Sequence, residues 1–210
     1  MNILAIGAHF DDVELGCGGA LARHVEQGDN VYVYIATLSG FSNQKGKIIR
    51  GNNIALKEAK EAMKILGIKK MFCGKFKTLE IEFIEKLNVD ILTIVEEQKI
   101  NFVYTHWIGD IHHDHQAVAK SSLHSCRHVS KLLMYRSNWY HSTQEFRGNF
   151  YVDITKFWKV KESSIRAHVS EVSRTGEKWI SFFKNEAENA GQRIGVRYAE
   201  VFELVKWLDK

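Results

Sequence analysis

Histidine and aspartate residues are concentrated in two short segments of this 210-residue chain. The first segment is residues 8–16 (AHFDDVELG), and the second is residues 110–115 (DIHHDH). A catalytic zinc takes about three nitrogen or oxygen ligands from the protein and leaves one position for water, whose pKa it lowers to about 7. His9, Asp12 and His115 could supply such a set. We therefore expect the two segments to form a one-metal hydrolase site.

The neighbours of these ligands have side chains suited to proton transfer. Asp11 adjoins Asp12 and is available as the general base that takes a proton from the metal-bound water as it attacks a carbonyl. His112, held protonated by Asp114 or Asp110, would stabilise the oxyanion and donate a proton to the leaving amine. A structural zinc needs neither a base nor an acid and is more often closed by four ligands, frequently cysteines. The residue types therefore favour amide hydrolysis.

Each segment begins where a predicted strand ends. Residues 1–7 (MNILAIG) and 101–105 (NFVYT) are short apolar runs of the kind found in buried strands. In open α/β sheets, ligands bind at the carboxyl edge of the strands, so two distant loops would meet in one crevice. An isolated His-x-x-His or Asp-Asp pair is more typical of a helix start or a turn. The position of both segments at the same edge of the predicted sheet is what favours a functional site.

The rest of the chain alternates predicted strands and helices. Further strands are expected at 31–37, 70–73, 132–135, 149–152 and 196–204, and helices at 18–27, 54–66, 83–98, 116–128, 154–172 and 175–190. Residues 38–51 are polar and are expected to form an active-site loop. The last strand alternates in a way that suits an edge or antiparallel position. We expect one domain over residues 1–210, a Rossmann-like three-layer α/β/α sandwich with a mostly parallel sheet.

Composition argues against several other functions. The net charge of +4 is mild, and no nucleic-acid-binding motif is present. No apolar stretch reaches about 18 residues and no signal-peptide pattern begins the chain, so we expect a cytoplasmic protein without membrane insertion. The three cysteines lack any Cys-x-x-Cys spacing, which disfavours both disulfides and a thiolate zinc site. The Gly-rich dinucleotide turn and the Gly-x-Ser-x-Gly elbow of serine hydrolases are also missing from the sequence.

In the two segments the chain resembles the PIG-L-like (LmbE-like) zinc-dependent N-deacetylases, which remove acetyl groups from N-acetylglucosamine conjugates. The family motif Ala-His-Pro-Asp-Asp-x-Glu-Leu-Gly is matched by residues 8–16, with Phe10 in place of proline. The motif Asp-x-His-Pro-Asp-His is matched by residues 110–115, with His113 in place of proline. Further similarity lies at Gly18-Gly19, Glu58-Ala59, Leu66-Gly67, residues 152–155, Lys161 and residues 195–202. Because proline fixes φ, its loss from both motifs predicts less rigid loops.

The resemblance implies roles for individual residues. Carried over one by one, they are His9, Asp12 and His115 as metal ligands, Asp11 as general base, and His112 as acid or oxyanion group, positioned by Asp114. It also implies a small amino-sugar conjugate as substrate and a homo-oligomeric assembly. The implied metal is Zn²⁺, although Fe²⁺ or another divalent ion could occupy a His/Asp/His set.

Substrate contacts are harder to assign from the sequence. Many family members carry an arginine where this chain has Ala55, and Arg50 is the candidate replacement. An arginine in such a polar loop is, however, more typical of an exposed residue. The other candidates are Trp107, Tyr135, Arg136, Trp139 and Arg147, because sugar sites combine aromatic and polar groups. Core packing is the more common role of a lone aromatic such as Trp107.

Two alternative functions remain open. One is an amidase that acts on a larger sugar amide or a thiol conjugate. The other is a degenerate metal-binding protein, in which Phe10 and His113 have displaced the loops and abolished turnover.

Overall fold

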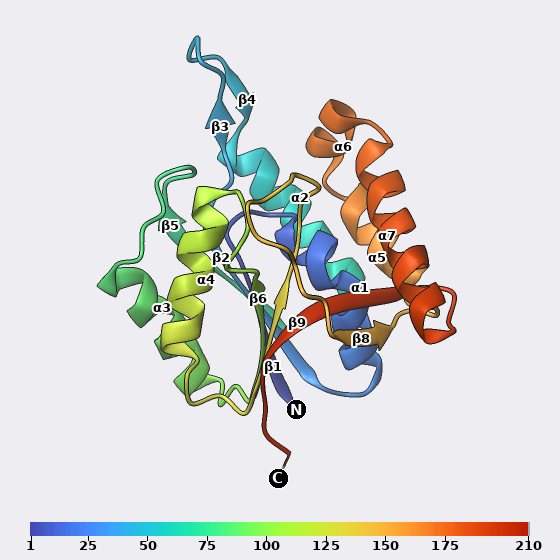
Figure 1. Ribbon diagram of the computed structural model, residues 1–210. Helices are drawn as coiled ribbons and strands as arrows, with labels where there is room; N and C mark the ends of the chain where they lie inside the picture. Colours follow the sequence, from blue (N-terminus) through green and yellow to red (C-terminus); the bar gives the residue numbers. More distant parts are fainter. Residues whose placement is uncertain (210) are drawn as a thin grey trace.

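A seven-stranded sheet forms the centre of the computed structural model, which describes residues 1–209. The strand order is β5-β2-β1-β6-β7-β9-β8. Figure 1 shows the sheet in the middle of the molecule with helices on either side. The strands are β1 (Asn2–Gly7), β2 (Asn30–Thr37), β5 (Lys70–Phe76), β6 (Phe102–His106), β7 (Lys131–Tyr135), β8 (Phe150–Asp153) and β9 (Ala199–Trp207). Parallel pairing runs from β5 through β7, whereas β9 is antiparallel to both β7 and β8. The antiparallel last strand was expected, but it lies inside the sheet, with β8 at the edge.

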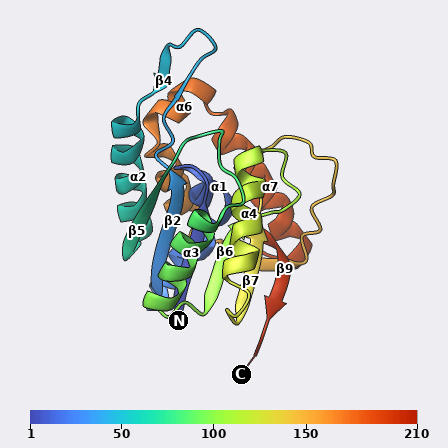
Figure 2. The same ribbon diagram turned by 90° about the vertical axis from the view of Figure 1, so that its left-hand side faces the viewer.

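Helices cover both faces of this sheet. They are α1 (Asp12–Glu26), α2 (Asn52–Leu66), α3 (Glu85–Glu97), α4 (His113–Ser125), α5 (Trp158–Arg166), α6 (Val169–Thr175) and α7 (Lys178–Ile194). One core cluster joins α1 and α2 to one face, and a second joins α3 and α4 to the opposite face. Figure 2 shows α3 and α4 together on their side of the strands. The predicted three-layer α/β/α fold is confirmed.

Helix α1 begins earlier than the sequence suggested, at Asp12 rather than near Gly18. Gly16 and Gly19 lie inside α1, where neighbouring side chains pack closely against them. A Cβ atom on Gly16 would lie 2.0 Å from the Tyr135 ring, and one on Gly19 would lie 2.8 Å from Ile154. Both glycines therefore allow α1 to lie close to its neighbours, which fixes the helix that starts at the candidate site.

Two other segments differ from expectation. The helix predicted over residues 154–172 is divided into α5 and α6, because the chain turns at His168, whose φ and ψ are −79° and 63°. The loop predicted over residues 38–51 contains a small antiparallel hairpin, formed by β3 (Phe41–Ser42) and β4 (Ile48–Arg50). This hairpin projects from the body of the molecule (Figure 1). Its second strand brings Arg50 back to the edge of the sheet where β1 ends.

Within residues 1–209, no helix combines the length and the apolar character needed to cross a bilayer.

Candidate active site

The carboxyl ends of β1 and β6 bring the two motif segments together. His9 Nδ1 lies 3.5 Å from Asp12 Oδ2, and His115 Nε2 lies 3.2 Å from Asp12 Oδ1. Asp12 is in the first turn of α1, and His115 is in the first turn of α4. All three side chains are largely buried. The residues predicted to bind a metal therefore lie side by side, although they are about 100 positions apart in the sequence.

Each of the two imidazoles also contacts a second carboxylate through its other nitrogen. His9 Nε2 lies 2.8 Å from Asp114 Oδ2, and His115 Nδ1 lies 3.1 Å from Asp110 Oδ2. Histidines that bind metals typically donate their second ring N–H to a carboxylate, which fixes the tautomer and leaves the first nitrogen for the metal. Asp114 gives His9 this arrangement through a hydrogen bond, and Asp110 lies at ion-pair distance from His115 Nδ1. The donor set therefore fits a divalent metal next to Asp12.

The described part of the chain contains two groups of three side chains that could each hold a metal ion. Within each group, the donor atoms all lie within 4.8 Å of one another. One group is His9, His112 and His115, and the other is Asp12, His106 and His115. The predicted set of His9, Asp12 and His115 draws on both groups. A metal could therefore be held in this cluster, with His106 and His112 as its nearest additional imidazoles.

His106, the last residue of β6, also lies in this cluster. It is fully buried, its Nε2 atom lies 3.1 Å from Asp12 Oδ2, and its ring stacks on His115 with centroids 3.9 Å apart. Asp12 also accepts hydrogen bonds from the Ser137 hydroxyl at 3.0 Å and the His9 backbone N–H at 2.7 Å. The one available signal was that His106 ends a buried strand at the ligand-binding edge. Nothing in the sequence pointed to Ser137.

Electrostatic interactions follow from this dense packing. Burial alone would lower the pKa of His115, but the Asp12 and Asp110 carboxylates outweigh it and raise that pKa to about 10. In the same way, burial is outweighed by Asp114 and Asp12 at His9, whose pKa rises to about 9. The carboxylates thus favour positive charge at this point, which is the condition that a bound cation requires.

His112 differs from its expected state. Its Nδ1 atom accepts a hydrogen bond from the Asp114 backbone N–H at 3.2 Å, whereas the Asp114 carboxylate contacts His9 instead. Burial and the neighbouring rings of His115 and His9 lower the pKa of His112 to about 4. A neutral ring that accepts at Nδ1 carries its proton on Nε2. The contacts therefore make His112 a neutral hydrogen-bond donor rather than a cation held by its own carboxylate.

Asp11 is the residue just before α1, and its backbone is unusual. Its φ of 109° is in the left-handed region, where a residue other than glycine costs about 1–3 kcal/mol unless the surroundings enforce it. Burial, together with the Asp12 carboxylate, raises the pKa of Asp11 to about 7. A carboxylate with a pKa near neutrality is suited to accept and return a proton. Strained residues of this kind cluster at functional sites.

Arg50 contacts Asp11 and is not the exposed loop residue that its sequence context suggested. It is 3% exposed, and its guanidinium lies 3.4 Å from Asp11 Oδ2 and 3.0 Å from Glu58 Oε2. It also donates to His168 Nδ1 at 3.2 Å. His168 is fully buried and contacts Glu14 Oε1 at 2.8 Å through its other ring nitrogen.

A pocket of about 280 Å³ opens over these residues. It is lined by His9, Asp11, Asp12, His112, His115 and Arg50, with Phe41, Trp139, Tyr140 and Trp179 among the remaining wall residues. Trp139 was a sequence candidate, whereas the other three aromatic residues were missed because they come from separate elements and carry no motif. A polar floor with aromatic walls is the usual composition of a small-ligand site.

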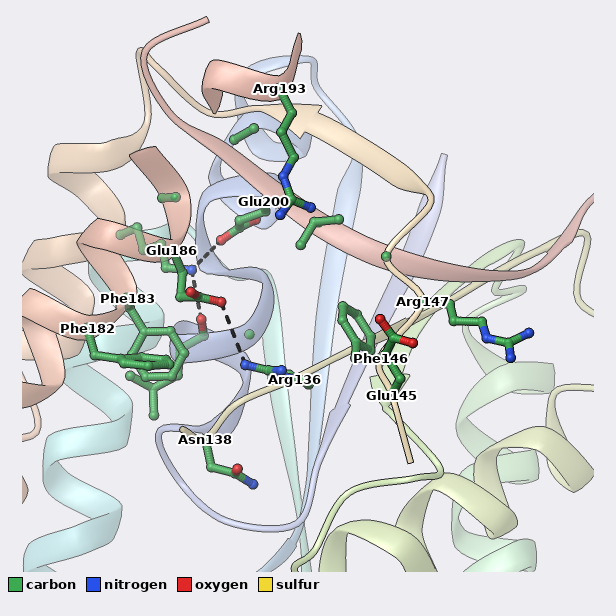
Figure 3. Close-up of a pocket in the computed structure, with 17 residues that line it drawn as sticks. Arg136, Asn138, Glu145, Phe146, Arg147, Phe182, Phe183, Glu186, Arg193 and Glu200 are labelled. Atoms are coloured by element: carbon green, nitrogen blue, oxygen red, sulfur yellow. Dashed lines mark hydrogen bonds and ion pairs between the residues drawn. The ribbon is translucent and has the colours of Figure 1, made fainter. Parts of the chain in front are cut away.

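The remaining substrate candidates lie elsewhere in the structure. The Tyr135 hydroxyl donates to the Ile6 carbonyl at 2.8 Å beneath α1, and the buried Trp107 ring packs edge-on against Phe146. Arg136 pairs with Glu186 at 3.6 Å in a neighbouring cavity of about 370 Å³, which Figure 3 shows. None of these three side chains lines the pocket over Asp11. Arg147, the last of the candidates, lines the same neighbouring cavity as Arg136.

Comparisons with known proteins agree with this geometry. The family model described as GlcNAc-PI de-N-acetylase (PIG-L) matches residues 4–126, more than half of the chain, and includes both motif segments. The uncharacterized deacetylase YaiS of Escherichia coli K12 is 36% identical over 142 residues, which cover 65% of this chain and 74% of that protein. The diacetylchitobiose deacetylase of Thermococcus kodakarensis is 25% identical over 222 aligned positions, covering 97% and 83% of the two chains. Among solved structures, the conserved protein TT1542 of Thermus thermophilus has the same fold, with a TM-score of 0.84, 23% identity, and coverage of 99% and 96%.

Proposed function

Because this chain belongs to the GlcNAc-PI de-N-acetylase (PIG-L) family of hydrolases, we propose that it removes the N-acetyl group from an N-acetylglucosamine-type sugar conjugate in a zinc-dependent reaction. The observation that carries the proposal is the pairing of His9 with Asp114 and of His115 with Asp110 around Asp12. This arrangement orients three ligands toward a metal, while the Asp11 carboxylate lies beside them and is not one of the ligands. A purely structural site has no need for such an additional carboxylate.

His9, Asp12 and His115 would hold the metal, which when bound supplies a Lewis acid and lowers the pKa of water. Asp11 takes the proton of the attacking water through its carboxylate. Because burial keeps the pKa of Asp11 near 7, the same group can return that proton to the departing sugar amine. Water and amide thereby become acetic acid and the free amine, with one proton of water moved to nitrogen through Asp11. At neutral pH the acid then loses its remaining proton and the amine takes one up, which leaves acetate and an ammonium group.

His112 lines the pocket beside His9, with their ring centroids 4.9 Å apart. With Nδ1 occupied by the Asp114 N–H, its Nε2–H is available to donate to the carbonyl oxygen as negative charge develops there. A neutral donor in a buried site stabilises an oxyanion without first losing hydration of its own. We therefore assign the oxyanion role to His112 and the proton transfer to Asp11.

The rest of the pocket suits a sugar. Trp139, Tyr140 and Phe41 offer apolar ring surfaces, and Arg50 brings polar N–H groups to the same wall. Glu171, whose Oε1 atom lies 4.0 Å from Arg50 Nε, lines the same pocket, so this ion pair offers both donors and acceptors to sugar hydroxyls. We propose Arg50 and these aromatic residues as the substrate contacts, in place of Tyr135, Trp107 and Arg136.

Acetate release from a panel of N-acetylglucosamine conjugates tests the proposal. The panel carries a nucleotide, a lipid, a small acid or a second sugar, and each reaction is run with zinc-loaded and chelator-treated protein. Release of acetate and free amine in equal amounts, lost on chelation and restored by zinc, is the expected result. No acetate from any conjugate, at one zinc per chain, would overturn the proposal.

A further inference from the structure

The chain that leaves β2 is hydrogen-bonded to the loop that carries Asp11. Ser39 lies two residues beyond β2, is 3% exposed and lines the candidate pocket. Its hydroxyl oxygen accepts a hydrogen bond from the Phe10 backbone N–H at 2.6 Å. Phe10 directly precedes Asp11, so this contact holds the peptide next to the strained residue.

A second contact holds the loop on the other side of His9. The Thr37 hydroxyl and backbone N–H both donate to the Ala8 carbonyl, at 2.9 and 3.1 Å. The Ser39 N–H in turn donates to the Thr37 hydroxyl oxygen at 3.1 Å. The backbone of the His9 segment is thus attached to the end of β2 on both sides, at Ala8 and at Phe10.

Ser39, at one end of this contact, and Asp11, the residue after Phe10 at its other end, both have an unfavourable backbone. Ser39 has a φ of 57° and Asp11 a φ of 109°, and neither is glycine. Such conformations persist only where surrounding interactions enforce them. The buried Ser39–Phe10 hydrogen bond is one such interaction, since a buried N–H must find a partner. It acts beside Arg50, which lies 3.5 Å from the Phe10 carbonyl and 3.4 Å from Asp11 Oδ2.

We propose that Ser39 is a positioning residue for Asp11, and that its hydroxyl fixes the Phe10 peptide so that the Asp11 carboxylate faces the pocket. This inference rests on the proposed function. It also explains how the first motif keeps its shape without proline. Proline fixes φ and has no N–H, whereas Phe10 leaves φ free and has an N–H that Ser39 binds.

The substitution Ser39→Gly removes the hydroxyl while tolerating the positive φ. We expect kcat to fall about ten- to a hundredfold, the size of effect that misplacement by roughly 1 Å can produce, with KM changed less than about twofold. The matched control Ser42→Gly removes an exposed hydroxyl from the hairpin and should leave both constants unchanged. A kcat within about twofold of the parent, or a raised KM with unchanged kcat, would overturn the positioning role.

Two backgrounds separate the hydrogen bond from the loss of the Phe10 ring, which is buried in the core. Phe10→Ala removes the ring but keeps the N–H, whereas Phe10→Pro removes both. Ser39→Gly should still lower kcat at least tenfold in the Phe10→Ala background and should have no effect in the Phe10→Pro background. Equal effects in the two backgrounds would refute the proposed contact.

Amide hydrogen exchange, measured by NMR, tests the contact without any substrate and without the core substitutions. The Phe10 amide should be protected in the parent protein and should exchange at least tenfold faster in Ser39→Gly. If the parent releases no acetate, the proposed function fails, and this exchange measurement still decides the contact. Unchanged protection of Phe10 would overturn the inference even in an active enzyme.

Discussion

Replacing Arg50 with methionine should destabilise the protein strongly. The guanidinium is 2% exposed and is the shared partner of Glu58 at 3.0 Å, Asp11 at 3.4 Å and Glu171 at 4.0 Å. These three carboxylates are themselves at most 13% exposed, so water cannot replace the lost cation. Methionine fills much of the volume of the side chain but leaves the buried carboxylates without their counter-charge.

The size of the effect follows from the burial. Removing one partner of a buried ion pair costs about 3–5 kcal/mol. For a chain of this length, each kcal/mol lowers the melting temperature by about 2–4 °C, so Arg50→Met should melt roughly 6–20 °C below the parent. Because Arg50 also lines the pocket, catalytic activity should fall in the protein that remains folded.

Thermal melts and urea titrations, followed by circular dichroism, measure this change. Arg136→Met is the matched control, because Arg136 is 34% exposed and its partner Glu186 is 50% exposed, at 3.6 Å. An exposed pair of this kind contributes about 0–1 kcal/mol. If Arg50→Met melts within about 2 °C of Arg136→Met, Arg50 does not stabilise the buried carboxylates.

Two further predictions concern groups around the site. Burial alone would raise the pKa of Glu58, but hydrogen bonds from Ser170 and Arg50 outweigh it and lower that pKa below the ordinary 4.5. The stability contributed by ionised Glu58 is therefore present above about pH 4.5 and is lost as the pH falls through the lowered pKa. The difference in melting temperature between the parent and Glu58→Gln should consequently shrink on acidification. A difference that stays constant from pH 7 to about pH 3 would contradict this assignment. Tyr135→Phe should cost about 0.5–1.5 kcal/mol in urea titrations, because it removes the buried hydrogen bond to the Ile6 carbonyl. It should leave KM unchanged, whereas an increased KM would show that Tyr135 contacts substrate after all.

The layers of the fold were accessible from the sequence because they depend on periodic apolar runs. Strands β1, β2 and β6 are continuous apolar segments, as expected for strands covered on both faces. The boundaries of helices were harder to predict from the sequence where close packing overrides local helix propensity. Gly16 and Gly19 reduce helix propensity, yet both lie within α1 because no larger residue fits against Tyr135 and Ile154.

The residues of the candidate site also differ in whether the sequence could predict them. His9, Asp12 and His115 could be found because their spacing and their positions at strand ends carry a signal. The burial of Arg50 could not, because it depends on Glu58 and on the small hairpin that returns the chain to β1. Short strands such as β3 and β4 show no periodicity that would distinguish them from a loop.

The two absent motif prolines have consequences that only the structure could show. At the first motif, the Phe10 N–H is bound by Ser39, so the expected loss of rigidity is offset by a hydrogen bond. At the second motif, His113 is the first residue of α4. Proline is favoured at that position because its missing N–H would have no helical partner, and for the same reason another residue is tolerated there.

The central claim, that Asp11 is the base of a metal hydrolase, is tested most directly by Asp11→Asn. Zinc content and the rate of acetate release are measured on the same zinc-loaded preparation, beside the parent protein. Asparagine tolerates the left-handed backbone, so the loop should keep its shape. We expect about one zinc per chain and a rate reduced by about 10²- to 10⁴-fold. Full activity in Asp11→Asn with stoichiometric zinc would contradict the assignment of Asp11 as the base.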